Sequence, residues 1–253
     1  MKKIKLITWA IASSMLLLLS CSNDDPTPTE NKEVVKLPVK ITFTGDESAH
    51  NFEYDTNDRI TKLVCTKVGG ENKIFNFTYD GAGKLVKITD DRGFVHSFEY
   101  SDHKITETVM DNDTYDYSVF YKLNEKEQVT EYSFDENDAT PFICSYDNKG
   151  NLLKHSYISG SNNDEEYGLE NLVYDTKKGM MSQVKSPSWV YFIIGDLEFE
   201  FSYLVNNTLK QRLTYDGYTY NFVYGYDEEG YPVTMTEEEQ ISPEVLIEYK
   251  TVE

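Results

Sequence analysis

The architecture of this chain follows from one stretch, Tyr79-Asp80-Gly81-Ala82-Gly83-Lys84-Leu85-Val86-Lys87-Ile88. An Asp side chain can bond to its own backbone two residues further on, and Gly tolerates a positive φ, so Asp-x-x-Gly reverses the chain direction. Before this turn, Phe75, Phe77 and Tyr79 alternate with other residues and therefore share one face of an extended chain. The stretch predicts two antiparallel strands joined by a tight turn.

The same unit recurs along most of the chain. Its Tyr falls in register at Tyr54, Tyr79, Tyr100, Tyr121, Tyr146, Tyr174, Tyr203, Tyr226 and Tyr249. An Asp follows several of them, at Asp55, Asp80, Asp147, Asp175 and Asp227, and a Gly comes soon after at Gly83, Gly150, Gly179 and Gly230. Repeats of roughly 21–29 residues, each supplying about two strands, predict an all-β fold, an antiparallel meander of about 16–18 short strands.

The meander is expected to form a curled single sheet or a barrel-like shell, within a single repetitive β domain at residues 37–253. The sequence leaves open whether the sheet closes. In an open sheet the terminal strands need protection against pairing with other chains, and Lys36, Lys40, Glu248 and Lys250 would supply it.

A late hairpin indicates which strand face is buried. Its turn, Tyr215-Asp216-Gly217-Tyr218, has the Asp-Gly signature of a type I′ turn. One face of the following strand is aromatic throughout, with Tyr218, Tyr220, Phe222, Tyr224 and Tyr226. A lipid-facing strand needs aliphatic side chains and about 9–11 residues to span a bilayer. The aromatic face is therefore predicted to be a packed interior, which disfavours an outer-membrane pore.

The repeat spacing lengthens between residues 177 and 194, where the run Trp189-Val190-Tyr191-Phe192-Ile193-Ile194 is apolar on both faces. This run is either a doubly buried strand or part of an insertion with a helical turn, and Pro187 interrupts any helix across the whole segment. Trp189 and Tyr191 are candidate ligand contacts, because exposed aromatic rings can pack on sugar faces. Packing in a core or under a lid is the alternative.

Composition excludes several classes of protein. The 253 residues include 24 Lys and Arg against 44 Asp and Glu, a net charge of −20. A hydrophobic fraction of 39% and a mean hydropathy of −0.55 exclude a polytopic membrane protein. The acidic balance disfavours nucleic acid as a partner, because phosphate binding needs a basic face. The aromatic fraction of 14%, with 20 Tyr, argues against global disorder.

Residues 1–20 have the features of a lipoprotein signal peptide. Lys2, Lys3 and Lys5 precede an apolar stretch at 6–19 that is too short to span a bilayer comfortably. It ends in Leu18-Leu19-Ser20-Cys21, which resembles a bacterial lipobox and implies lipidation of Cys21 after cleavage. The alternative is an ordinary signal peptide that ends near a Cys. Removing residues 1–20 takes away three Lys and no acid, so the net charge becomes −23 rather than −20.

Residues 21–36 contain Pro, Thr and charged residues without an apolar period, which predicts a flexible tether after the lipidated Cys. The pair Asp24-Asp25 resembles the surface-export signal of Bacteroides-type lipoproteins, and a solvated linker start is the alternative. We therefore expect the membrane as a partner through the lipid anchor, and a location at the outer membrane, exposed on the cell surface.

No catalytic or cofactor motif is recognisable. The four His, which are His50, His96, His103 and His155, form neither HExxH nor a close pair, and a strand His with a local partner is the expected reading of His96. The acid-rich turns at 111–116, 135–138 and 164–166 fit no EF-hand loop, and calcium binding by them stays undecided. The sequence predicts neither an enzyme, nor a cofactor, nor a metal site.

Two Cys besides Cys21 lie in apolar, strand-like runs, at Cys65 and Cys144. An exported protein can form a disulfide, but a free buried Cys is at least as common because it packs as a small hydrophobic residue. Both alternatives stay open.

The repeat unit resembles a known one. The stretches 79–85 and 146–152 resemble the YD (Rhs-type) repeat, although Lys84 and Asn151 stand where that family usually has Arg. The chain is far shorter than the toxin-enclosing shells of that family, so only the hairpin unit carries over.

The whole layout resembles Bacteroides-type surface lipoproteins carrying a domain of unknown function that is described as porin-like. The resemblance rests on Cys21 with the residues after it, the loose Tyr repeats, and the segments 178–184 and 227–233. It would cover about residues 37–253 and implies a curled or barrel-like antiparallel sheet, with no catalytic residues.

The function expected from these features is a non-catalytic binding or structural role of a lipid-anchored cell-surface β protein, in contact with an extracellular glycan or protein. A more specific alternative is an accessory glycan-binding lipoprotein of a polysaccharide-uptake system. A third is a degenerate enzyme or an inhibitor that uses paired acids in a barrel mouth.

Overall fold

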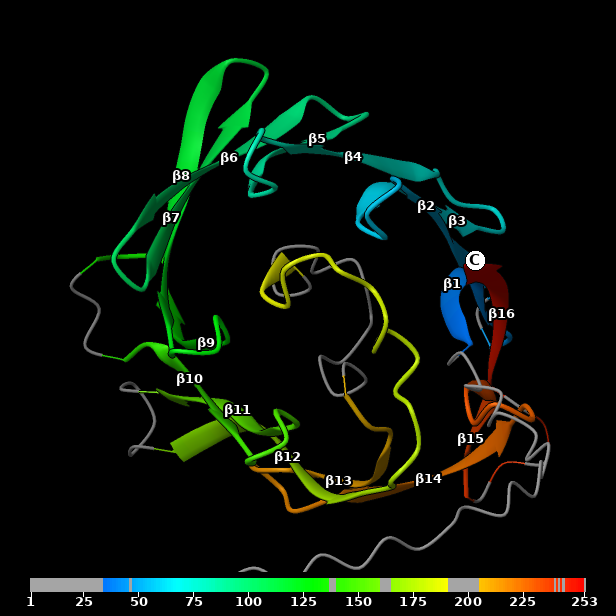
Figure 1. Ribbon diagram of the computed structural model, residues 1–253. Coiled ribbons are helices and arrows are strands. Elements are labelled where there is room, and N and C mark those ends of the chain that lie inside the picture. Colours follow the sequence, from blue (N-terminus) through cyan, green and yellow to red (C-terminus); the bar gives the residue numbers. More distant parts are fainter. Residues whose placement is uncertain are drawn as a thin grey trace, which may run out of the picture. The chain divides into compact units, whose positions relative to one another are not determined.

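The computed structural model describes residues 34–45, 47–136, 140–159, 165–190, 205–238, 240, 242 and 244–252. The unit Val34–Glu253 is a closed antiparallel barrel (Figure 1). Its strands are β1 (Val35–Phe43), β2 (Ser48–Tyr54), β3 (Ile60–Lys67), β4 (Lys73–Tyr79), β5 (Leu85–Asp90), β6 (Phe94–Ser101), β7 (Lys104–Asp111), β8 (Thr114–Leu123), β9 (Val129–Ser133), β10 (Phe142–Tyr146), β11 (Leu152–Ser159), β12 (Glu165–Tyr174), β13 (Thr208–Leu213), β14 (Thr219–Tyr226), β15 (Pro232–Glu237) and β16 (Val245–Val252).

The predicted all-β meander is confirmed, and the barrel closes. Each strand pairs with the next along the chain, and β1 pairs with β16 from Val35–Val252 to Phe43–Val245. The strand β1 begins two residues before the predicted start of the domain at residue 37. Lys40 forms an ion pair with Glu248 across this seam at 3.7 Å. The charged terminal strands therefore pair with each other and leave no sheet edge to protect.

The Asp turns that follow the repeat form most of the connections at one end of the barrel, although one similar turn, at Asp90, lies at the opposite end. In the β4–β5 turn, Asp80 Oδ1 accepts the N–H groups of Ala82 (2.9 Å) and Lys84 (2.8 Å). The turns that begin at Asp55, Asn124, Asp147 and Asp227 repeat this pattern. We call this end the Asp-turn end. The start of β1 and the β12–β13 connection lie there too, because every second connection of an antiparallel meander is at the same end.

Most of the repeated Tyr link each of these hairpins to the neighbouring one on the inside of the barrel. The Tyr79 hydroxyl donates to the carbonyl of Ile60, the first residue of the preceding strand, at 2.9 Å. Equivalent bonds join Tyr54 to Pro38, Tyr100 to Leu85, Tyr146 to Val129, Tyr174 to Leu152, Tyr224 to Thr208 and Tyr249 to Pro232. We call these Tyr the tyrosine belt. Each ring packs in the interior while its hydroxyl finds a backbone acceptor, which is how a buried Tyr is satisfied.

The chain between β12 and β13 leaves the barrel wall. Figure 1 shows its first part, in yellow, inside the ring of strands. We call residues 175–190 the plug segment. Met180, Met181, Trp189 and Val190 belong to the same buried cluster as the inward side chains of the strands. The insertion predicted for this region is therefore confirmed for residues up to 190, whereas residues 191–194 lie outside the described part.

The plug segment is fixed at the Asp-turn end. Ser186 Oγ accepts the N–H of Ile60 at 2.8 Å and lies 3.1 Å from the Tyr79 hydroxyl. The N–H of Lys185 donates to the carbonyl of Asp58 at 3.0 Å. These bonds connect the plug segment to β3, to β4 and to the turn between β2 and β3.

The outer face of the wall carries ion pairs beside some exposed apolar side chains, such as Ile143, Ile158 and Leu172, and its inner face is rich in aromatic rings. Phe222, Tyr224 and Tyr226 on β14 pack in the core, whereas Val223 between them is 55% exposed, as the alternation predicts. Cross-strand ion pairs lie on the outer face, joining Lys62 to Glu53 (3.2 Å), Lys154 to Glu170 (3.3 Å), and Lys122 to Glu131. A membrane-spanning barrel has the opposite arrangement, with an apolar outer band.

The predicted type I′ turn at 215–218 is wrong. Leu213 and Tyr218 bracket a four-residue loop, in which Leu213 N donates to Tyr218 O at 2.9 Å. Gly217 has a φ of 73°, but Asp216 is not among the residues with positive φ, which a type I′ turn requires at both centres. The Asp216 side chain accepts the N–H of Tyr218 and so holds the wider loop. The two-residue turn with positive φ at both centres is instead Asn112-Asp113, between β7 and β8.

No helix among the described residues has the length and apolar character that crossing a membrane requires.

Replacing Gly83 with Ala should destabilise the barrel. Gly83 has a φ of +86°, and a new Cβ would lie 2.9 Å from Arg59 Nη1. We expect the free energy of unfolding to fall by about 1–2 kcal/mol, the cost of a left-handed conformation for a residue with a Cβ. Urea denaturation measures it. Gly81→Ala in the same turn is the control, because its Cβ would meet nothing within 4 Å. Equal stability of both variants would contradict the assigned turn geometry.

Candidate functional site

Trp189, one of the two candidate ligand contacts, is packed in the interior. It is 2% exposed, and its ring contacts those of Phe98 and Tyr100 at centroid distances of 5.1 and 6.1 Å. Its ring therefore offers no open face for a sugar, and the core or lid alternative describes its surroundings. Tyr191 and the predicted lipidation site Cys21 both lie outside the described residues.

A second group of aromatic rings lies toward the end of the barrel opposite the Asp-turn end. Tyr132 stacks on Phe142 with centroids 4.6 Å apart and an interplanar angle of 4°. The series continues from Phe142 to Tyr157 (4.8 Å), to Tyr167 (5.7 Å) and to Tyr215 (6.1 Å). We call these five residues the aromatic track. It starts half-buried and ends at Tyr215, which is 58% exposed.

The sequence of no single strand predicts the aromatic track. Its members come from β9, β10, β11, β12 and the β13–β14 turn, so the sequence signal would be an aromatic residue at matching cross-strand positions. His155 lies beside the track, 2.9 Å from the Tyr132 hydroxyl through its Nε2. Burial lowers the pKa of His155 to about 4, so this imidazole is neutral at physiological pH.

The acid Glu107 is buried in the interior with two polar partners. Glu107 is 2% exposed and accepts from Tyr121 Oη at 2.6 Å, and His96 Nδ1 lies 2.6 Å from its other oxygen. His96 is therefore a strand His with a local partner, as expected. Burial first, and then the neighbouring Glu107, raises the pKa of Tyr121. The group is enclosed, so it resembles a structural network more than a reactive site.

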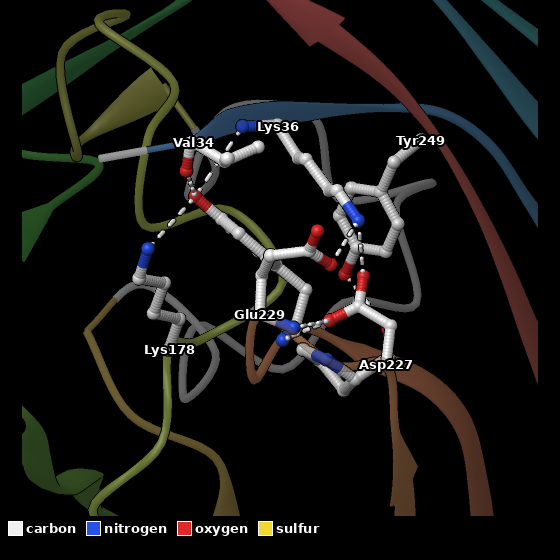
Figure 2. Close-up of polar contacts among 8 residues, drawn as sticks. Val34, Lys36, Lys178, Asp227, Glu229 and Tyr249 are labelled. Carbon is white, nitrogen blue, oxygen red and sulfur yellow. Dashed lines mark hydrogen bonds and ion pairs between the residues drawn. The ribbon is translucent and has the colours of Figure 1, made fainter. Parts of the chain in front are cut away.

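A polar cluster connects the first strand to the plug segment (Figure 2). Lys36 Nζ lies between Asp227 Oδ2 (2.8 Å) and Glu229 Oε2 (2.7 Å). The buried Tyr231 donates its hydroxyl proton to Val34 O, and the same oxygen lies 3.3 Å from both Lys36 N and Lys178 Nζ. We call these residues the seam cluster, which joins β1, the β14–β15 turn and the plug segment.

Charge pairing controls the ionisation of the seam cluster. Hydrogen bonds to Asp227 and Glu229 raise the pKa of Lys36. Burial alone would raise the pKa of Asp227, but the bond from Lys36 and the backbone N–H groups of Tyr231 and Glu229 outweigh it, and the pKa is lowered. Both groups are therefore charged over the whole physiological range.

Cys65 and Cys144 are not joined in a disulfide, which decides between the alternatives left by the sequence. Burial raises the pKa of the Cys144 thiol to about 12, so it stays protonated and unreactive. Across the described part of the chain, no three His, Cys, Asp or Glu side chains are grouped so that they would hold a metal ion.

No protein-family model and no curated protein matches the chain. Two similar solved structures are described as porin-like proteins. The one from Bacteroides uniformis ATCC 8492 is 14% identical with a TM-score of 0.36 and covers 85% of this chain and 98% of its own. The one from Bacteroides vulgatus ATCC 8482 is 13% identical with a TM-score of 0.38 and covers 85% and 99%. Similarity at this level carries no inference about function.

The fold and its interior define a class of protein: a sixteen-stranded antiparallel barrel with a polar outer wall, an aromatic interior and an inserted plug segment.

Replacing Asp227 with Asn tests the seam cluster. Asn keeps an oxygen for the turn, as Asn124 does, but loses the charge paired with Lys36. Because folding lowers the pKa of Asp227, its contribution is present above the unfolded value of about 4 and is lost as pH falls through the folded value. We expect the variant to be less stable by about 0.5–1 kcal/mol near neutral pH, with the difference shrinking below about pH 4.

Thermal and urea denaturation across pH measure this difference. Asp80→Asn is the control, because Asp80 makes the same turn bonds but has no ion pair in the described structure. The same loss in both variants would mean that the ion pair with Lys36 contributes nothing.

Proposed function

We propose that this protein is a lipid-anchored, non-catalytic barrel on the outer surface of the outer membrane, with a binding or structural role. One observation carries the proposal, the polarity of the wall. Ion pairs such as Lys62–Glu53 and Lys154–Glu170 project outward, while the aromatic side chains project inward. A wall with this polarity is stable in water and unfavourable in hydrocarbon, because a charged side chain facing lipid costs several kcal/mol.

Membrane attachment would then come from the N-terminal side of the barrel. The sequence 18–21 resembles a lipobox, and acyl chains on Cys21 would supply attachment that the wall does not. The described part of the barrel begins at Val34, just before β1, at the Asp-turn end. There the Tyr231 hydroxyl donates a hydrogen bond to the carbonyl of Val34. The chain that precedes the barrel therefore joins it at the Asp-turn end, whereas the aromatic track lies toward the opposite end.

A non-catalytic role is supported by how the interior titratable groups are held. Glu107 and His96 are occupied with each other and with Tyr121, and the Cys144 thiol is buried and protonated. The groups with perturbed ionisation are thus explained by packing and by pairing.

Replacing Cys21 with Ala should abolish membrane attachment while leaving the barrel folded. We expect the variant to lose incorporation of labelled fatty acid and to leave the membrane fraction of the expressing cells. Cys65→Ala is the matched control, since Cys65 is a thiol within β3 and in no disulfide. A Cys21→Ala protein that is exported normally and still stays in the membrane fraction would contradict the proposal.

Glycan binding is a second candidate function, and the aromatic track favours it. A sugar ring packs its C–H face on an aromatic ring, and the Tyr hydroxyls can bond to its hydroxyl groups. Tyr167 and the exposed Tyr215 stack at an angle of 19°, and Tyr167 Oη donates to Glu165 at 2.8 Å. An aromatic surface bordered by a carboxylate suits a neutral, hydroxyl-rich ligand.

This candidate predicts that Tyr215→Ala weakens glycan binding about tenfold, because one stacking surface is lost. A glycan array would select the ligand, and isothermal titration would measure its affinity. Val223→Ala on the outer face is the control, since Val223 is similarly exposed (55%) but points away from the interior. An array without any bound glycan, or equal affinities of both variants, would exclude the role of the aromatic track.

A further inference from the structure

Two clefts border the plug segment at the Asp-turn end. The larger, of about 620 Å³, lies between residues 185–189 and the β4–β5, β6–β7 and β8–β9 turns. The smaller, of about 250 Å³, lies beside residues 181–188 and the β8–β9 and β10–β11 turns. Lys126, Ser186 and Ser188 line both, so the two clefts meet along the plug segment.

Lys outnumber acidic residues in the described lining of the clefts, whereas acidic residues outnumber basic ones in the protein as a whole. The larger is lined by Lys84, Lys104, Lys126 and Lys185 against Asp102, Glu125 and Glu127. The smaller is lined by Lys126 and Lys149, and no acidic residue of the described part of the chain lines it. In a chain with 44 acidic and 24 basic residues, a convergence of Lys is not expected by composition. A locally positive concave site attracts and selects anionic ligands.

Two of these Lys are held in place. Lys126 Nζ donates to Asn148 O at 3.0 Å, and Lys84 Nζ lies 4.7 Å from the centre of the Tyr100 ring. By contrast, Lys149 and Lys185 have no ion pair among the residues that the structure describes. Their ammonium groups are therefore available to a ligand, beside a Lys that is already oriented.

A buried polar atom in the smaller cleft also points to a ligand. Ser182 Oγ is buried without a hydrogen-bond partner in the described structure, and Ser182 lines the cleft. A buried hydroxyl without a partner costs free energy, which a bound polar group would recover. Ser188, which lines both clefts, adds a second hydroxyl.

We propose that the joined clefts bind a small polar molecule that carries an oxyanion, of the kind found in an acidic sugar. Lys126, Lys149 and Lys185 would contact the phosphate, sulfate or carboxylate, and the Ser hydroxyls would bond to its polar body. The volumes fit a ligand of about one or two sugar rings. This inference rests on the proposed function in one respect: an extracellular source of the ligand requires the surface location. The clefts are a different site from the aromatic track.

The protein carries its own reporter for this site. Its two Trp are Trp9, within the predicted signal peptide, and Trp189, which lines the larger cleft. In a chain of residues 22–253, which keeps the whole barrel unit, Trp189 is therefore the sole Trp fluorophore. Ligand entry beside it should change its emission.

The test is a fluorescence titration of this chain with sodium glucuronate, inorganic phosphate and glucose at constant ionic strength. We expect a saturable change in Trp189 emission with glucuronate or phosphate and none with glucose. In a second series at higher NaCl concentration, the affinity for the anion should be lower. Lys126→Gln should weaken binding about tenfold, because it removes the charge shared by both clefts. Lys40→Gln is the matched control, with the same change of charge on the outer wall.

Circular dichroism first establishes that both variants fold. The proposal is overturned if neither anion gives a saturable change, if glucose binds as well, or if the two variants bind equally. These outcomes are independent of the Cys21→Ala experiment, because the titration uses a chain without the anchor.

Discussion

The bond from each belt Tyr to a backbone carbonyl is the interaction on which the barrel depends. Tyr79 shows the arrangement: its ring lies in the interior, its hydroxyl reaches Ile60 O, and the next residue, Asp80, forms the turn. In the pair Tyr79-Asp80, the Tyr thus bonds to the preceding strand and the Asp reverses the chain toward the next one. The same bond recurs at most repeats from Tyr54 to Tyr249, so the belt rings lie inward around the barrel, which closes where β16 meets β1. A polar outer wall follows from the alternation along each strand.

The plug segment is an insertion in one of the repeated turns, the one between β12 and β13. At the end of β12 the chain begins a turn with Asp175, and Asp175 then binds the Asn207 N–H and the Tyr226 hydroxyl far along the chain. The turn therefore stays closed while residues 176–190 run into the barrel. Ser186 of the plug segment bonds to the backbone of Ile60 and lies beside the hydroxyl of Tyr79, a member of the tyrosine belt. The clefts form where the plug segment meets the turns at the Asp-turn end.

Local signals in the sequence predict most of the local structure here, although the Asp216-Gly217 signature predicted a type I′ turn that the chain does not form. The turn at Asp80, the inward face of Phe222 and the strand number all follow from turn chemistry and period-two alternation. The copy of the turn at Asn124 was missed because Leu123 precedes it instead of a Tyr. Barrel closure, the aromatic track and the Lys clefts depend on register between distant strands, which no single stretch encodes.

In the proposed function, a charged wall around an aromatic interior keeps this barrel in water, and an N-terminal lipid would supply its attachment to the membrane. Sedimentation of residues 22–253 in buffer without detergent, with far-ultraviolet circular dichroism on the same sample, tests it most directly. The account predicts a discrete folded species with a β spectrum. A chain that aggregates unless detergent is present, and that inserts into lipid bilayers once reconstituted, would contradict it.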